Sequence, residues 1–205
     1  MSVERYFGLP GCGKTTFLAY LALRAVKGKK YKNVYANVHL KIPGVTYIPF
    51  RECFGTYELR DCIYFIDEAT VNCGDRDYKN FSQKMIQYTM EHRHHCCDLV
   101  FFSQEADGMD KKIRSITDRI YFVYKGIFTR GFISSAVRVP YKILWPDGDH
   151  DGENAGRILM GYVRPPFLNR LFAKRLFRPK YYKYFDSWEC DRLPDLPDKF
   201  MAYTE

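Results

Sequence analysis

Hydrophobic residues follow two alternating patterns from residue 3 to about residue 124. Short hydrophobic runs predict strands, and recurrence every three or four positions predicts helices. The predicted strands span residues 3–7, 33–38, 62–68, 98–104 and 119–124. The predicted helices cover residues 17–25, 81–90 and 109–116. This order predicts an α/β fold, a mostly parallel sheet with helices on both faces, in which residues 45–49 form an edge because of Pro49.

The pattern changes after Lys125. Residues 132–139 and 141–144 predict a β-hairpin or an extension of the sheet, and residues 193–198 are rich in proline and aspartate. We therefore expect one domain over residues 1–145 and a C-terminal extension over residues 146–205.

The C-terminal extension carries the excess positive charge. The net charge is +8, and residues 157–185 contain eight basic and no acidic side chains, which leaves 24 of each elsewhere. Hydrophobic residues in this stretch share one face of a predicted basic amphipathic helix. They are Phe167, Leu168, Leu171, Phe172 and Leu176. Three alternatives stay open: contact with an anionic membrane surface, contact with single-stranded DNA, and packing against the domain.

Composition indicates a globular protein, since 46% of its 205 residues are hydrophobic and it contains 17 tyrosines and 16 phenylalanines. We expect no signal peptide and no membrane-spanning segment, and therefore a cytoplasmic location. The seven cysteines are expected to be free thiols.

Residues 8–15 match the phosphate-loop pattern G-x-x-x-x-G-K-[ST] at every fixed position, between a predicted strand and a predicted helix. Glycines let the backbone N–H groups surround a phosphate, and the start of the helix favours the same anion. Lys14 is expected to hold the β- and γ-phosphates of ATP, and Thr15 the magnesium ion. The residues expected to bind nucleotide are Gly8, Pro10, Gly11, Cys12, Gly13, Lys14, Thr15 and Thr16.

Asp67 and Glu68 end a hydrophobic strand, where a phosphate-loop enzyme places its acids. Asp67 is expected to hold magnesium through water, and Glu68 to activate the attacking water, which favours hydrolysis over phosphoryl transfer to another acceptor. Gln104 ends the next hydrophobic strand, which is expected to lie between the phosphate-loop strand and the strand that ends in Asp67 and Glu68. The side-chain amide of Gln104 is expected to report whether the γ-phosphate is present.

The sequence resembles the zonular occludens toxin-like ATPases, which include the gene I assembly protein of filamentous bacteriophages. The resemblance rests on residues 8–16, 35–38, 66–69, 92–94, 98–104, 110–114 and 118–119. It implies a RecA-like fold, use of ATP and magnesium, homo-oligomerisation and a role in phage extrusion through the bacterial inner membrane. Family members commonly continue into a transmembrane helix, so we expect a peripheral position at that membrane or a separate membrane assembly protein as partner.

Oligomeric motors of this class place an arginine from one subunit at the nucleotide of its neighbour. Arg93, Arg114 and Arg119 are the candidates, and Arg93 is preferred. The neighbouring histidines and cysteines of residues 92–97 lack the usual spacing of zinc ligands, and the acidic loop at residues 147–153 lacks the last carboxylate of a calcium loop.

These patterns predict a magnesium-dependent ATP-hydrolysing motor that drives virion assembly and secretion of a filamentous phage or prophage. Phage single-stranded DNA or its protein complex is a candidate partner. Two alternatives remain from the sequence: a DNA-translocating or packaging ATPase of the same fold, with the basic C-terminal stretch on DNA, and a nucleotide-dependent interaction module without turnover.

Overall fold

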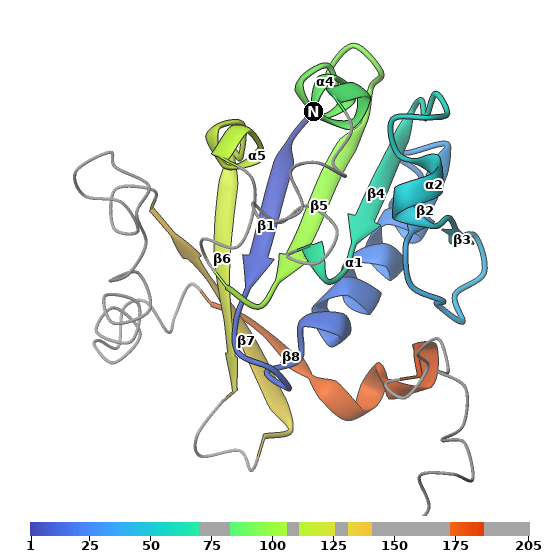
Figure 1. Cartoon of the computed structure of the whole chain (residues 1–205). Helices are drawn as coiled ribbons and strands as arrows, with labels where there is room; N and C mark the ends of the chain where they lie inside the picture. Colours follow the sequence, from blue (N-terminus) through green and yellow to red (C-terminus); the bar gives the residue numbers. More distant parts are fainter. Residues whose placement is uncertain (70–82, 106–110, 126–130, 141–172, 187–205) are drawn as a thin grey trace, which may run out of the picture.

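The computed structural model describes residues 1–69, 83–105, 111–125, 131–140 and 173–186. These residues form an eight-stranded sheet with the strand order β3-β2-β4-β5-β1-β6-β7-β8. Six neighbouring strands run parallel (Figure 1), and they are β1 (Val3–Phe7), β2 (Asn33–Ala36), β3 (Thr46–Tyr47), β4 (Cys62–Ile66), β5 (Asp98–Ser103) and β6 (Arg119–Lys125). The prediction of a mostly parallel α/β sheet is confirmed.

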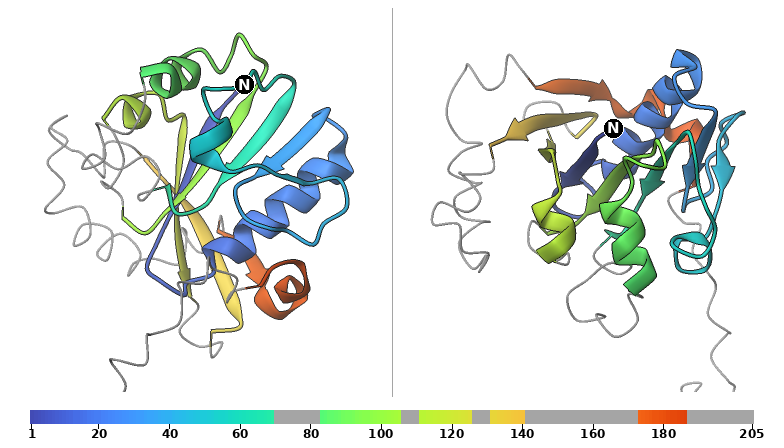
Figure 2. Two further views of the ribbon diagram at one scale, coloured as in Figure 1. Left: turned by 45° about the vertical axis from the view of Figure 1, so that its right-hand side comes forward. Right: turned by 90° about the horizontal axis from the view of Figure 1, so that it is seen from above.

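Helices cover both faces of the sheet (Figure 2). Helix α1 (Lys14–Gly28) lies on one face, whereas α2 (Phe50–Cys53), α4 (Gln83–Met90) and α5 (Lys111–Ser115) lie on the other. This two-sided cover explains why the central strands are hydrophobic at consecutive positions, since alternate side chains point to opposite faces. Phe65 and Phe102 belong to the core beneath α1, while Ile66 and Phe101 belong to the core beneath α2 and α4.

Two antiparallel strands extend the sheet beyond β6. Strand β7 (Ile133–Val139) pairs with β6 on one side and with β8 (Lys174–Phe177) on the other. The expected β-structure at residues 132–139 is confirmed, and residues 141–144 lie outside the described part. Strand β8 thus places part of the C-terminal extension in the same sheet as β1.

The prediction of a basic amphipathic helix is wrong for residues 174–177. These residues form β8, in which Leu176 is buried under α1 and its neighbours are exposed. Pairing with β7 satisfies backbone groups that this edge would otherwise leave unpaired. Residues 167–172 of the predicted helix lie outside the described residues.

Short 3-10 turns follow β8, namely η3 (Arg178–Lys180) and η4 (Tyr182–Tyr184). The ring of Tyr181 meets that of Tyr20 on α1 edge to face, with centroids 5.9 Å apart. The backbone N–H of Lys41 donates to the carbonyl oxygen of Tyr184 at 2.8 Å. These contacts fix the segment after β8 across α1, next to the loop that follows β2.

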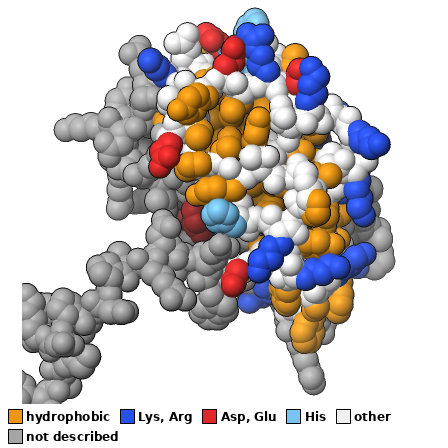
Figure 3. All heavy atoms as spheres, turned by 90° about the vertical axis from the view of Figure 1, so that its right-hand side faces the viewer, with side chains coloured by type: hydrophobic (Ala, Val, Ile, Leu, Met, Phe, Trp, Pro, Cys, Tyr) orange, Lys and Arg blue, Asp and Glu red, His pale blue; other side chains and the backbone are white. Residues whose placement is uncertain are grey.

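The opposite end of the sheet is its β3 edge, as predicted for residues 45–49. Among the described strands, β3 pairs with β2 alone, and its Tyr47 is 42% exposed. Figure 3 looks onto this side of the molecule and shows hydrophobic side chains gathered on the surface, with Lys and Arg side chains near them. Within the described ranges, no helix combines the length and the apolar character needed to cross a membrane.

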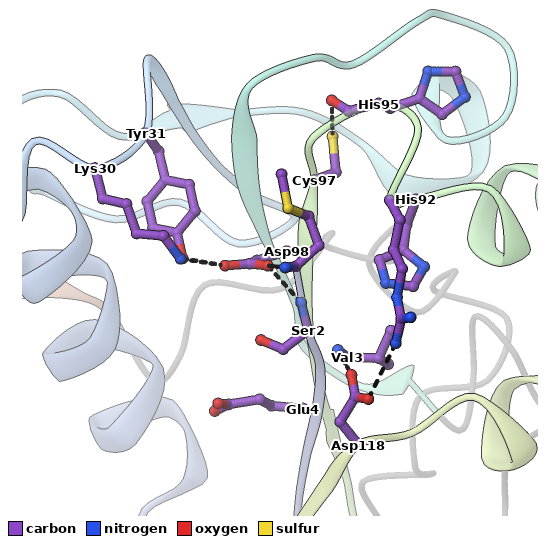
Figure 4. A network of polar contacts seen from close by, with 12 residues as sticks. Ser2, Val3, Glu4, Lys30, Tyr31, His92, His95, Cys97, Asp98 and Asp118 are labelled. Atoms are coloured by element: carbon purple, nitrogen blue, oxygen red, sulfur yellow. Dashed lines mark hydrogen bonds and ion pairs between the residues drawn. The ribbon is translucent and has the colours of Figure 1, made fainter.

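The amino ends of the central strands are joined by a polar network around Asp98 (Figure 4). The Asp98 carboxylate accepts hydrogen bonds from the Ser2 backbone N–H at 2.6 Å, from Lys30 Nζ at 3.0 Å and from the Tyr31 hydroxyl. Burial raises the pKa of Asp98, but these hydrogen bonds outweigh it and lower the pKa below its ordinary value. The ionised carboxylate therefore stabilises the start of β1 and β5.

We expect Asp98→Asn to lower the free energy of unfolding at pH 7 by about 1–3 kcal/mol, because two neutral amide atoms replace a charged acceptor. A group with a lowered pKa stabilises the fold above its unfolded pKa and loses that effect as pH falls. The difference between variant and parent should therefore narrow below about pH 4 in denaturant titrations.

The matched control for this prediction is Asp61→Asn. Asp61 pairs with Lys32 at 2.8 Å, but its side chain is 44% exposed, so the change should cost less than about 1 kcal/mol. Equal losses for Asp61→Asn and Asp98→Asn would contradict the stabilising role of the buried network.

Candidate nucleotide site

The predicted phosphate loop connects β1 to α1 at the carboxyl edge of the sheet (Figure 1), and Lys14 is the first residue of the helix. Gly13 has a φ of +99°, and a Cβ at this position would lie 2.2 Å from Ser134 Oγ. Both the left-handed backbone and the close approach of β7 therefore require glycine. Ser134 Oγ also donates to the Cys12 carbonyl oxygen at 2.6 Å, so β7 supports the loop from outside.

Lys14 is buried, with 7% of its surface exposed, and its amino group stays at the loop. Its Nζ donates to the carbonyl oxygens of Gly8 at 2.8 Å and Leu9 at 3.3 Å. The same amino group can donate to phosphate oxygens bound at the loop, since an ammonium has three donors.

Thr15 and Asp67 meet beside the loop, as expected for a magnesium site. Thr15 Oγ1 donates to Asp67 Oδ2 at 3.2 Å. Asn37, directly after β2, holds the Asp67 backbone from both sides: its Oδ1 accepts the Asp67 N–H at 2.6 Å, and its Nδ2 donates to the Asp67 carbonyl at 3.0 Å. The position of the carboxylate is therefore fixed by two neighbouring strands.

A hydroxyl and one carboxylate fit magnesium bound together with nucleotide, because Mg²⁺ usually keeps several waters and uses few protein ligands besides phosphate oxygens. The part of the chain that the structure describes contains no group of three His, Cys, Asp or Glu side chains that could hold a metal by themselves. The acidic loop of residues 147–153, which was compared with a calcium-binding loop, lies outside the described residues.

Burial raises the pKa of Asp67 to about 6, although the Glu68 backbone N–H and Thr15 donate hydrogen bonds that oppose the rise. Asp67 is 6% exposed, so its ionised form loses hydration in the fold. A cation at this position would restore favourable electrostatics and lower this pKa again.

Glu68 and Gln104 are brought together by the predicted strand order. Strand β5 lies between β4 and β1, as expected, so both side chains leave the same edge of the sheet beside the phosphate loop. Gln104 Nε2 donates to the two carboxylate oxygens of Glu68 at 3.1 and 3.3 Å. The backbone of Glu68 has a φ of +49°, an unusual conformation for a non-glycine residue that turns the chain directly after Asp67.

These residues surround a cavity of about 780 Å³, a volume suited to a nucleotide-sized ligand. Predicted site residues that line it are Pro10, Gly11, Gly13, Lys14, Thr15, Thr16, Asp67, Glu68 and Gln104. Gly8 and Cys12 are part of the loop but are not among the lining residues. Further lining residues, for which the sequence predicted no role in this site, are Asn37, Val38, His39, Tyr47, Arg178, Tyr182, Phe185 and Asp186.

Two kinds of signal could have found some of these additional residues. Asn37 lies near the carboxyl end of the strand predicted over residues 33–38, at the edge where the other site residues lie, and within the motif of residues 35–38. Arg178 and Tyr182 belong to the basic C-terminal stretch, but only the pairing of β8 with β7 places them beside the phosphate loop.

Arg93 lies at the opposite, amino edge of the sheet. Its Nη2 contacts Asp118 Oδ1 at 3.4 Å, and Asp118 Oδ2 accepts the Val3 backbone N–H at 2.8 Å near the network of Figure 4. A strand of five residues spans roughly 16 Å, so Arg93 does not reach the cavity of its own chain. Its action on a neighbouring subunit stays a prediction.

The other two candidate arginines are also engaged away from the cavity. Arg119 Nη1 contacts Glu4 Oε1 at 3.0 Å, whereas Arg114 is 2% exposed. Burial makes Arg114 unsuited to reach another subunit in this conformation.

Three features define the RecA-like fold of P-loop NTPases. They are the phosphate loop between β1 and α1, the acids that follow β4, and the position of β5 between β1 and β4. The N-terminal domain of zonular occludens toxin from Neisseria meningitidis has a similar structure, with a TM-score of 0.56 and 17% identity over 90% of this chain and 98% of that one. The fold is thus Zot-like, as the sequence motifs predicted.

Two further solved structures share less of the chain. The genome packaging NTPase B204 of Sulfolobus turreted icosahedral virus 2 gives a TM-score of 0.49 and 11% identity over 67% of this chain and 91% of that one. The flagellar accessory protein FlaH of Methanocaldococcus jannaschii gives a TM-score of 0.47 and 10% identity over 68% of this chain and 78% of that one. Neither a protein-family model nor a curated protein sequence matches the chain.

Asp67→Asn should stabilise the protein at pH 8 in the absence of nucleotide. The raised pKa means that the folded state disfavours the charged carboxylate, so the parent loses stability as pH rises from about 4 through about 6. An amide avoids this loss, and the gain is expected to be about 1–3 kcal/mol at pH 8 and near zero at pH 4.

Denaturant unfolding at the two pH values checks this prediction. Thr15→Val is a useful companion variant, because it removes the hydroxyl while retaining the buried charge and should not produce the same gain. Destabilisation by Asp67→Asn at pH 8 would contradict the assignment of Asp67 as a carboxylate whose ionised form is disfavoured by burial.

Proposed function

We propose that the protein is a magnesium-dependent ATPase motor that drives virion assembly and secretion of a filamentous phage or prophage at the bacterial inner membrane. The observation that carries the hydrolytic part is the contact between Gln104 and Glu68 at the cavity that contains Lys14, Thr15 and Asp67. The Zot-like fold supports the assembly role.

Each residue has a distinct task in this proposal. Lys14 and the loop N–H groups bind the β- and γ-phosphates, and Thr15 and Asp67 orient the magnesium shell. Magnesium, when bound with ATP, neutralises charge on the phosphates. Glu68 accepts a proton from the attacking water, and Gln104 holds Glu68 in place until the γ-phosphate offers its amide another acceptor.

This exchange of partners gives the site a way to couple hydrolysis to movement. The amide of Gln104 can donate to Glu68 or to a phosphate oxygen, and we expect the exchange to move Gln104 at the end of β5. We further propose that the motor acts as a homo-oligomer and works with a membrane surface or a separate membrane assembly protein on the phage single-stranded DNA or its protein complex.

The test is ATP turnover and nucleotide binding by the purified chain. Glu68→Gln should reduce turnover by at least about 100-fold while ATP affinity changes little, since it removes the proton acceptor but retains the shape. Lys14→Ala should weaken ATP binding itself. Turnover per chain should rise with protein concentration if neighbouring subunits complete the site.

Glu105→Gln provides the matched control for Glu68→Gln. Glu105 is the exposed residue directly after Gln104 and does not line the cavity, so its change should leave turnover within about twofold. Normal ATP binding with no turnover at any protein concentration would refute the motor and favour a nucleotide-dependent interaction module.

A further inference from the structure

Arg178 is a positively charged residue of the nucleotide cavity for which the proposed hydrolysis provides no role. It starts η3 directly after β8 and lines the cavity together with Lys14 and Thr15. Its Nε lies 3.3 Å from the position that a Cβ on Gly13 would occupy, which puts the guanidinium against the phosphate loop of the same chain.

The backbone around Arg178 fixes this position. Its N–H donates to the Phe132 carbonyl oxygen at 2.8 Å, and its side-chain Nη1 donates to the Gly131 carbonyl oxygen at 3.0 Å. The Tyr182 ring lies near the guanidinium, with 5.7 Å between Cζ and the ring centroid. The side chain is therefore held at the loop by Gly131, just before β7, and by Tyr182 of η4.

Within the described ranges, no carboxylate forms an ion pair with Arg178. Its Nε is shielded from solvent without a hydrogen-bond partner. Keeping a partly buried guanidinium and an unused N–H donor is unfavourable unless an anion completes the site. Phosphate oxygens match this donor set, because arginine binds them through paired N–H groups.

The strand order indicates which phosphates are within reach. Asp67, Glu68 and Gln104 follow β4 and β5, on one side of β1, whereas Arg178 follows β8, on the other side. The acids and Gln104 define the end of the cavity for the γ-phosphate and attacking water. Arg178 meets the loop at Gly13, and it comes from β8 and not from the strands that carry the acids and Gln104.

We infer that Arg178 binds the α- and β-phosphates of the nucleotide in the same chain, so that the C-terminal segment after β8 completes the nucleotide site. This inference rests on the proposed nucleotide-binding function. It makes Arg178 a phosphate-binding residue common to the ATP and ADP states, distinct from an arginine supplied by a neighbouring subunit.

The experiment measures dissociation constants of fluorescent ADP and ATP analogues with magnesium, at protein concentrations where light scattering shows a monomer. Arg178→Ala should raise the dissociation constants of the ADP and ATP analogues by a similar factor, about 10- to 100-fold. Arg178→Lys should recover part of the affinity, because it restores the charge without the paired donors. Thermal unfolding without nucleotide shows whether each variant is folded.

Lys180→Ala is the matched control, since Lys180 is an exposed cation of the same η3 turn and does not line the cavity. It should change affinity less than about twofold. Lys14→Ala tests nucleotide binding separately from the role of Arg178. If Lys14→Ala weakens nucleotide binding and a folded Arg178→Ala variant does not, the inference about Arg178 is refuted while nucleotide binding stands.

Two other results would also be decisive. Loss of ATP affinity without loss of ADP affinity would place Arg178 at the γ-phosphate and overturn the assignment to the α- and β-phosphates. Absence of binding by the parent chain, or no effect of Lys14→Ala, would refute the proposed function itself.

Discussion

Parallel pairing of β1, β5 and β4 is the constraint on which the site depends. In parallel strands the carboxyl ends meet at one edge, and the observed register aligns Phe7 with Ser103 and Ile66 with Phe101. The residues that follow these strands are therefore presented together: the phosphate loop, Gln104 and Asp67. A register shift of one residue would exchange the two faces of a strand and separate these groups.

The site keeps unfavourable features that the rest of the fold must offset. Asp67 is a buried carboxylate whose pKa is raised to about 6, and Glu68 has a φ of +49°. Two hydrophobic cores and the Asp98 network at the far edge stabilise the strands that hold these groups. Such local costs are typical of sites whose charges are balanced only when a ligand is bound.

The motifs on which the resemblance to the zonular occludens toxin-like ATPases rests lie at both edges of the sheet. Those around Lys14, Asp67 and Gln104 form the cavity at the carboxyl edge. Arg93, Asp98 and Asp118 lie at the amino edge, where Asp98 and Asp118 accept the backbone N–H groups of Ser2 and Val3. The second set thus positions β1, whose far end carries the phosphate loop.

The sequence by itself determined the α/β class, the central strands and most of the cavity residues, because hydrophobic period and phosphate-loop spacing are local properties of the chain. It misassigned residues 174–177 as helix, since short segments with mixed spacing fit either period and the β7 edge that pairs with them is more than thirty residues away in sequence. Only tertiary structure placed Asn37 behind Asp67 and Arg178 beside Gly13, because strand pairing between distant segments decides which side chains meet.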